Sequence, residues 1–305
     1  MSLILSLVAQ LLHVALMIAA APLAAGAADW LEARFAGRSG PPVLHPWRDL
    51  VRQSRKTPAE TEAGSVVLRH APAVAFGVTL AAAALVPSFT LSMALAPLAD
   101  CLVVVSLLAV ARVAEVLGAL DGGAASPGLA AQNSSAAAVP AEAALIVIVF
   151  AMALMGGSFD LDTIINQVRD TGWYPGAAAA IVLAGLLVLA VIDHDAAGSG
   201  LDQVASDARL ALMRQTAWIR RLVWFDLIGA LFLPIGLATA GSGPIDWCAG
   251  LLAWAVRLGG FILGLAAIRA LLGPVSSRRA PRAAAVGLVL GMIAIVLVLA
   301  SARQA

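Results

Sequence analysis

Long apolar runs separated by short polar connections occupy most of the chain. About eight of these runs have the length that an α-helix needs to cross a bilayer, roughly 20 residues. Proline and glycine, which are typical of helix ends, stand at most of their boundaries. The predicted spans cover residues 3–25, 71–87, 97–118, 140–156, 175–192, 222–240, 247–272 and 283–300. The pattern predicts an all-α polytopic membrane protein with one membrane domain over residues 1–305.

Two boundaries leave alternatives open. The break at Pro87 and Ser88 fits either a loop between the second and third spans or a proline kink. The first run resembles a signal peptide, with small residues at 24–28. It is longer than a typical signal core, and no Lys or Arg precedes it, so a retained first helix is favoured.

Basic residues collect in every second connection. The first connection, about 26–70, holds seven Lys or Arg, the fifth, about 193–221, holds four, and the seventh holds three. Cytoplasmic loops of membrane proteins carry this excess. We therefore expect a long cytoplasmic first loop and both termini outside.

Composition excludes several classes of protein. The chain is 61% hydrophobic and 12% charged, with a formal net charge of +1. A soluble domain has about twice that charged fraction, and a nucleic-acid-binding surface needs a basic excess. Cys101 and Cys248 are far apart and the four histidines are scattered, so we expect no metal site and no redox centre in this chain.

The first loop contains a short amphipathic segment. Its apolar and basic members are Trp47, Leu50 and Val51 on one side and Arg48, Arg52, Arg55 and Lys56 on the other. One interpretation is an interfacial helix on anionic membrane lipid, and the other is a docking surface for a cytoplasmic partner. A second amphipathic stretch, 159–173, is predicted to lie on the outer surface.

Several short blocks of residues occur in a definite order along the first half of the chain. The first-loop block is Arg34, Arg38, Gly40, Pro41, His45, Pro46, Asp49 and Leu50. Further blocks are 69–72, Asp100 with 107–112, 120–123, and Gly128 with Glu142 fourteen residues later. By their order and spacing together, these blocks resemble subunit 1 of respiratory complex I, and most closely its relatives in membrane-bound [NiFe] hydrogenases, the formate hydrogenlyase subunit 4 type. The resemblance is clear over about residues 1–157.

The resemblance implies a non-redox membrane subunit of a complex-I-like oxidoreductase, in the inner (plasma) membrane of a prokaryote. It implies that the first-loop block docks a peripheral module of hydrogenase-like large and small subunits. Antiporter-like membrane subunits are the other implied partners, with proton or sodium translocation as the coupled process. The [NiFe] centre and iron–sulfur clusters are expected in the partner subunits.

The chain departs from the family pattern at several points. Ala36 replaces a glutamine, 132–134 replace Ser-Arg-Glu, and Ala143 replaces a proline. The fifth connection keeps acidic residues but lacks the family's arginine and Pro-Val-Asp, and Arg269 stands where a carboxylate is common. Either this is a divergent hydrogenase-type subunit without a quinone pocket, or the scaffold has lost coupling.

Charged residues inside predicted spans are the candidate functional groups, because each costs roughly 2.5–3.5 kcal/mol at mid-membrane. Six qualify: Asp100, Arg112, Glu115, Glu142, Asp226 and Arg257. Arg112 and Glu115 are three residues apart and fit an ion pair on one helix. Asp226 has Arg220 and Arg221 nearby, whereas Arg257 needs a partner from another helix or water. Asp100 is expected toward the outer leaflet.

A proton path is the hypothesis for Glu115, Glu142, Asp207 and Asp226. Structural pairing is the alternative for Glu115 and Asp226, and an interfacial position is the alternative for Glu142. Three other functions stay open: the quinone-chamber subunit of an NADH–quinone oxidoreductase, a free-standing secondary transporter, and a structural anchor. Small residues at 259, 260 and 264 are expected to allow close helix packing.

Overall fold

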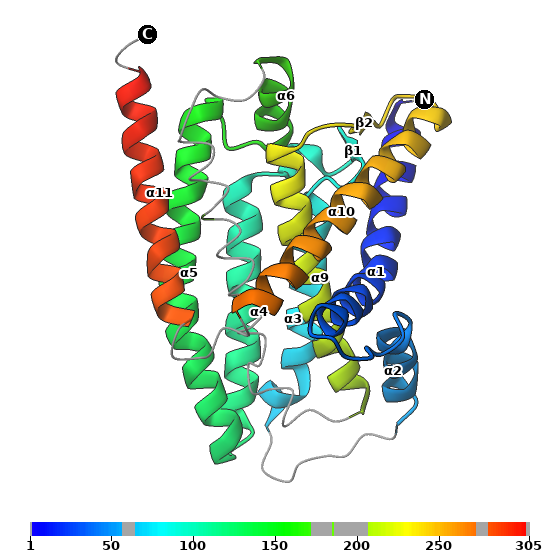
Figure 1. Ribbon diagram of the computed structural model, residues 1–305, viewed down its shortest axis with the longest axis vertical. Helices are drawn as coiled ribbons and strands as arrows, with labels where there is room; N and C mark the ends of the chain where they lie inside the picture. Colours follow the sequence, from blue (N-terminus) through cyan, green and yellow to red (C-terminus); the bar gives the residue numbers. More distant parts are fainter. Residues whose placement is uncertain (1, 57–64, 172–184, 186–206, 273–279, 303–305) are drawn as a thin grey trace.

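The computed structural model describes residues 2–56, 65–171, 185, 207–272 and 280–302. Long helices lie side by side along one direction (Figure 1). The helices are α1 (Ser2–Phe35), α2 (His45–Ser54), α3 (Val66–Leu85), α4 (Cys101–Asp121), α5 (Ala125–Gly156), α6 (Leu161–Thr171), α9 (Asp207–Phe232), α10 (Pro244–Leu272) and α11 (Ala280–Ala302). The prediction of an all-α polytopic membrane protein is confirmed.

Among the described residues, five helices are long and apolar enough to cross a membrane, namely 3–35, 66–85, 101–121, 125–154 and 244–270. α1 begins and α11 ends at one end of the bundle, whereas α2 and the start of α9 lie toward the other end (Figure 1). The fifth predicted span, 175–192, lies outside the described residues. The count of eight spans and the side that faces the cytoplasm therefore stay predictions.

Three predicted boundaries differ from the helix ends in the structure. α1 ends at Phe35, ten residues past Ala25, and the helix dipole favours the cation Arg34 in its last turn. α5 begins at Ala125, and Pro140 lies inside it within an alanine-rich stretch. α9 begins at Asp207, so the second half of the predicted fifth connection is helical.

Two helices end at prolines, at similar heights in the bundle. α3 ends at Leu85, two residues before Pro87, and α9 ends at Phe232, two residues before Pro234. Bends or a turn follow each break before the chain enters a strand. The strands β1 (Thr90–Leu91) and β2 (Ala238–Thr239) form a short parallel ribbon. The prediction that the sixth span continues to Ala240 is therefore wrong, whereas the break at Pro87 is a true helix end.

Polar side chains of α1 satisfy the backbone at the first break. Pro87 has no N–H, so the carbonyl of Ala83, four residues earlier, loses its helical donor. His13 Nε2 donates to that oxygen over 2.8 Å, and His13 Nδ1 lies 2.7 Å from the Ser88 hydroxyl. Gln10 donates to the Ala84 carbonyl over 2.9 Å. Because unsatisfied backbone groups are costly away from water, these contacts permit the interruption.

A proline inside α1 is accommodated in the same way. Pro22 cannot donate to the Ile18 carbonyl, and Gln215 of α9 donates to that oxygen over 2.8 Å. Trp47 of α2 donates to the neighbouring Ala19 carbonyl over 3.2 Å. The turn of α1 before Pro22 is therefore hydrogen-bonded to both α9 and α2.

α6 is the amphipathic stretch that the sequence predicts to lie on the outer surface. It contacts the residues beside both strands of the ribbon, at the end of the bundle where α1 begins. Asp162 accepts a hydrogen bond of 2.7 Å from the Ser92 N–H, directly after β1. Arg169 reaches the Leu237 carbonyl, directly before β2. Burial raises the pKa of the Asp162 carboxyl, and the Ser92 hydrogen bond opposes that rise. Asp100, at the same end, accepts a 2.7 Å hydrogen bond from Leu102 N and caps α4.

The orientation of α2 differs from the predicted amphipathic pattern. Pro46, Asp49 and Gln53 are its buried residues, whereas Val51 is exposed. A polar inner face is stable here because α9 supplies the cation that Asp49 needs, as described below. The small residues at 259, 260 and 264 of α10 have open space around them among the described residues, so close packing at that face stays a prediction.

A close approach at Gly26 gives a test of the α1–α2 connection. A Cβ atom there would lie 2.0 Å from the Val43 carbonyl oxygen. Gly26→Ala is expected to lower the free energy of unfolding by about 1–3 kcal/mol, because the loop must move away from α1. Unfolding in mixed detergent micelles measures this change.

The matched control is Gly77→Ala in α3, where an added Cβ would meet nothing within 4 Å. It is expected to be neutral or to stabilise by up to about 1 kcal/mol, through helix propensity alone. Equal effects of the two substitutions would disprove the packing constraint at Gly26.

Candidate functional site

Buried charge is concentrated on α9. This helix contacts α1, α2, α3, α6 and α10, and every residue from Ile219 to Phe232 is buried. Arg220, Arg221 and Asp226 are almost completely enclosed. From Arg214 to Asp226 the helix rises about 18 Å, which is more than half the hydrocarbon thickness of a bilayer. We call the charged residues of this stretch and their partners the α9 polar line.

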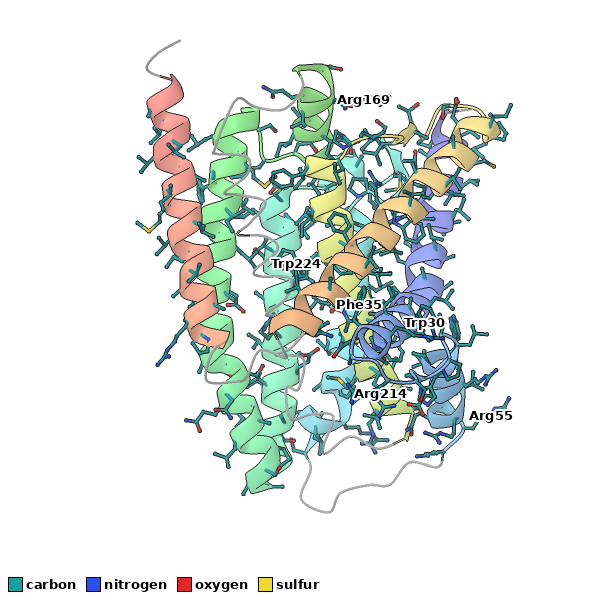
Figure 2. All side chains as sticks on the ribbon, viewed as in Figure 1. Trp30, Phe35, Arg55, Arg169, Arg214 and Trp224 are labelled. Carbon is teal, nitrogen blue, oxygen red and sulfur yellow. The ribbon has the colours of Figure 1, made fainter. Side chains whose placement is uncertain are left out.

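The polar line begins between α9 and α2. Asp49, on the inner face of α2, forms ion pairs with Arg214 of α9 and with Arg52 of its own helix. Asp49 is 6% exposed, whereas both arginines reach solvent. Figure 2 shows Arg214 between the lower part of α9 and α2. This pair connects the first loop to the central helix.

The next pair is fully enclosed. Arg220 of α9 and Glu115 of α4 form an ion pair, and both side chains are at most 4% exposed. A buried pair offsets its desolvation cost only with good geometry, and removal of one partner leaves a costly charge. Glu115 is therefore held by a residue more than 100 positions away in the sequence, and its pairing with the neighbouring Arg112 stays a prediction.

A second group of charges lies where α1 passes α9 and α10. Arg221 lies within electrostatic range of Asp29, and Arg269 Nη1 lies 3.4 Å from Glu32 Oε2. Beside them an open hollow of about 310 Å³ is lined by Asp29, Glu32, Ala33, Arg38, Ser39 and Pro41. The hollow connects the surface of the first loop to the polar line.

The polar line ends at Asp226. Trp254 of α10 donates to Asp226 Oδ1 over 2.7 Å, and Oδ2 has no partner among the described residues. Arg257 interacts electrostatically with this carboxyl. The same guanidinium donates to the Leu233 and Ser88 carbonyls over 2.9 and 2.5 Å. Arg257 therefore contacts both helix breaks and interacts with Asp226. Its partners come from other segments of the chain, as the sequence analysis expected.

The structure divides the predicted docking residues into three sets, the first of which packs against Trp30. Arg34 stacks over Trp30, with 5.0 Å from its guanidinium carbon to the ring centroid. Gly40 packs closely against Trp30, because a Cβ there would lie 3.1 Å from the Trp30 Cα. The hollow set is Arg38 and Pro41, and the α2 set is His45, Pro46 and Asp49.

The predicted proton-path residues are only partly brought together. Glu115 and Asp226 belong to the α9 polar line. Asp207 is the first residue of α9. Glu142 is half-buried inside α5 and not at the start of a span. Arg112 is half-buried on α4. The proton path through these residues stays a prediction.

Sequence reasoning missed the polar groups that serve the backbone. His13, Gln10 and Gln215 stand in apolar or mixed runs and match no motif. The usable signal was the prolines at 22 and 87, since each frees a carbonyl four residues earlier. Which side chain supplies the donor depends on helix packing. Within the described ranges, no three His, Cys, Asp or Glu side chains are grouped as a metal ion would require.

Comparison with known proteins agrees with this arrangement. A family model described as NADH dehydrogenase matches residues 7–196. Formate hydrogenlyase subunit 4 of Escherichia coli K12 is 28% identical over 179 residues, and hydrogenase-4 component C of the same organism is 26% identical over 228 residues. These alignments span 59% and 71% of this chain. They span 58% and 72% of the two relatives, so only part of the formate hydrogenlyase subunit is matched.

One solved structure shows the same fold. It is that of the membrane-bound sulfane sulfur reductase, described as an archaeal respiratory membrane complex, and one of its chains superposes with a TM-score of 0.76. The match covers 95% of this chain and 98% of that one, at 17% sequence identity. The relatives are subunits of multi-subunit membrane complexes, which supports partner subunits for this protein in general.

The buried Glu115–Arg220 pair gives a test of the polar line. Glu115→Gln or Arg220→Met alone is expected to lower the free energy of unfolding by about 3–5 kcal/mol, because each leaves its partner uncompensated. The double variant is expected to lose less than either single variant. A double-mutant cycle in detergent unfolding measures the coupling.

Glu32→Gln is the control, since the Glu32–Arg269 pair is longer and Glu32 is 36% exposed. Its expected cost is below about 1 kcal/mol. Additive losses at positions 115 and 220 would show that the two side chains do not act as a pair.

Proposed function

Because the chain belongs to the NADH dehydrogenase subunit 1 family, we propose that it anchors a peripheral redox module in the membrane and couples that module to ion translocation. The proposed complex is of the hydrogenase or formate hydrogenlyase type, since both curated relatives carry those names. The proposed location is the inner membrane of a prokaryote. This chain holds no redox group, and the [NiFe] centre and iron–sulfur clusters belong to the hydrogenase-like subunits.

The observation that supports the coupling role best is the α9 polar line. It runs from Asp49 beside the first loop, through the Glu115–Arg220 pair, to Asp226 beside the helix breaks. A change of charge at the first loop alters the electrostatic energy of the next ion pair, Glu115–Arg220, because buried surroundings screen charges weakly. A proton that neutralises Glu115, for example, leaves Arg220 uncompensated and drives it toward a new partner.

The hollow set and the α2 set of docking residues suggest how a peripheral module attaches. The hollow beside Arg38 has acidic and basic walls and suits polar side chains of a partner subunit. Asp49, on the inner face of α2, is the first member of the α9 polar line. A peripheral module that binds at the first loop is therefore close to the α9 polar line, and a change in its redox state can alter the charges of that line.

Affinity purification of the full chain from its native membranes in mild detergent tests the anchoring role. Stoichiometric recovery of hydrogenase-like large and small subunits with antiporter-like subunits is the expected result. Recovery of NADH dehydrogenase subunits instead would support the quinone-chamber function. Recovery of the chain alone, while other complexes stay intact, would exclude both and point to a transporter or a structural anchor.

Substitution of acidic residues tests the coupling role. Asp226→Asn keeps an oxygen that accepts from Trp254, and Glu142→Gln keeps the size of a half-buried side chain, so both are expected to assemble. The ratio of translocated protons to redox turnover is expected to fall about tenfold or more, because an amide neither releases nor takes up a proton at neutral pH. A pH-sensitive dye in inverted membrane vesicles reports translocation.

Asp246→Asn is the matched control, since Asp246 is an exposed carboxylate in the first turn of α10. It is expected to keep the wild-type ratio. Unchanged ratios in both test variants, in an assembled complex, would refute the proton path through these residues.

A further inference from the structure

The exposed side of α2 carries charge of one sign only. Its cations are Arg48, Arg52, Arg55 and Lys56, which we call the outer basic face. All four are exposed, and Figure 2 shows Arg55 pointing away from the bundle. The single acidic residue of this helix, Asp49, is turned inward and buried. Asp49 pairs with Arg52 from this inward position, and α2 has no second carboxylate to pair with Arg48, Arg55 or Lys56.

Contacts with α1 place this helix at the boundary of the bilayer. Trp47 donates to the carbonyl of Ala19, and the Val43 carbonyl lies directly against Gly26. α1 continues to Phe35, but its apolar part ends at Ala28, and Asp29, Glu32 and Arg34 follow within the same helix. α2 thus lies at the level where α1 leaves the hydrocarbon, which is the level of lipid headgroups.

Exposed apolar side chains adjoin the basic residues. Phe35 at the end of α1, Val43 and Leu44 before α2, and Val51 on α2 are each between about one third and one half exposed. Apolar groups beside long basic side chains at a bilayer boundary match a lipid, whose acyl chain and phosphate need both kinds of contact. A water-soluble protein surface accounts for the cations but not for the apolar groups at this depth.

We propose that the outer basic face binds the headgroups of anionic phospholipids in the leaflet on that side of the bilayer. The occupant is the lipid phosphate, held by Arg48, Arg55 and Lys56, with Phe35, Val43 and Val51 against the acyl chains. This site goes beyond the coupling function and does not require any partner subunit. Arg52 also pairs with Asp49, so a bound lipid lies one side chain away from the α9 polar line.

Reconstitution of the purified full chain tests the proposal. Spin-labelled phosphatidylglycerol and phosphatidylcholine are incorporated separately, and the motionally restricted fraction gives the relative affinity of each lipid for the protein. The wild type is expected to prefer phosphatidylglycerol. Arg48→Gln with Arg55→Gln is expected to weaken this preference by about fivefold per arginine, the effect of one basic residue at an anionic surface.

The control is Arg69→Gln with Arg282→Gln, which removes two exposed arginines at the starts of α3 and α11. It is expected to keep the preference for phosphatidylglycerol. Arg52 is left intact in both variants, so the pair with Asp49 is not disturbed. High salt is expected to weaken the wild-type preference as well, since the contact is electrostatic.

Three outcomes would overturn the proposal. The first is a wild type that does not distinguish the two lipids, and the second is an equal loss in the test and control variants. The third is loss of partner subunits from the purified complex with unchanged lipid preference, which would assign the outer basic face to a protein. The lipid measurement uses the isolated chain, so its result is independent of whether the coupling function is correct.

Discussion

Polar groups inside an apolar helix bundle must find partners within the protein, because neither lipid tails nor hydrocarbon side chains can hydrogen-bond to them. The arrangement of this protein follows from that constraint. α9 carries three arginines and an aspartate through the bundle interior, and α1, α2, α4 and α10 supply their partners. The central position of α9 is therefore a consequence of its sequence, since no lipid-facing position would tolerate it.

The same constraint explains the helix interruptions. Pro22 and Pro87 each leave a carbonyl without its helical donor, and side chains from distant segments donate to both. Pro234 follows the end of α9, and Arg257 donates to the Leu233 carbonyl directly before it. His13 and Gln10 serve one break, and Arg257 contacts residues at both breaks. Broken helices beside buried charges are a common arrangement where membrane proteins move ions, because non-helical backbone is tolerated only in protected, polar surroundings. Here the break region lies beside Asp226, at the inner end of the polar line.

The first loop connects these internal groups to the surface. α2 presents Asp49 to α9 on its inner side and four cations on its outer side. One short helix thus contacts both the charge-bearing core and the bilayer boundary. The hollow near Arg38 lies on the same loop, so the proposed sites for a peripheral module and for membrane lipid are separate surfaces. This division agrees with a subunit whose function is to join a soluble module to a membrane domain.

The sequence by itself determined the class of this protein and most of its helices. Apolar runs of spanning length, the alternation of basic connections and the first-loop block were enough to predict an all-α membrane protein and its family. These features are local, because the length and polarity of a segment decide whether it can cross a bilayer. The intramembrane charges at 115, 226 and 257 were also recognised, since any charge there is costly.

Tertiary structure decided which charges meet and where three helices begin or end. Nothing near Glu115 in the sequence points to Arg220, and the charged side chains of α9 find their partners on four other helices, α1, α2, α4 and α10. The inward turn of Asp49 on α2 departs from the pattern expected from amphipathicity, because Arg214 of α9 gives this carboxylate a partner on the inner side while Val51 stays exposed. Pairings of this kind depend on three-dimensional packing, which periodicity and composition do not encode.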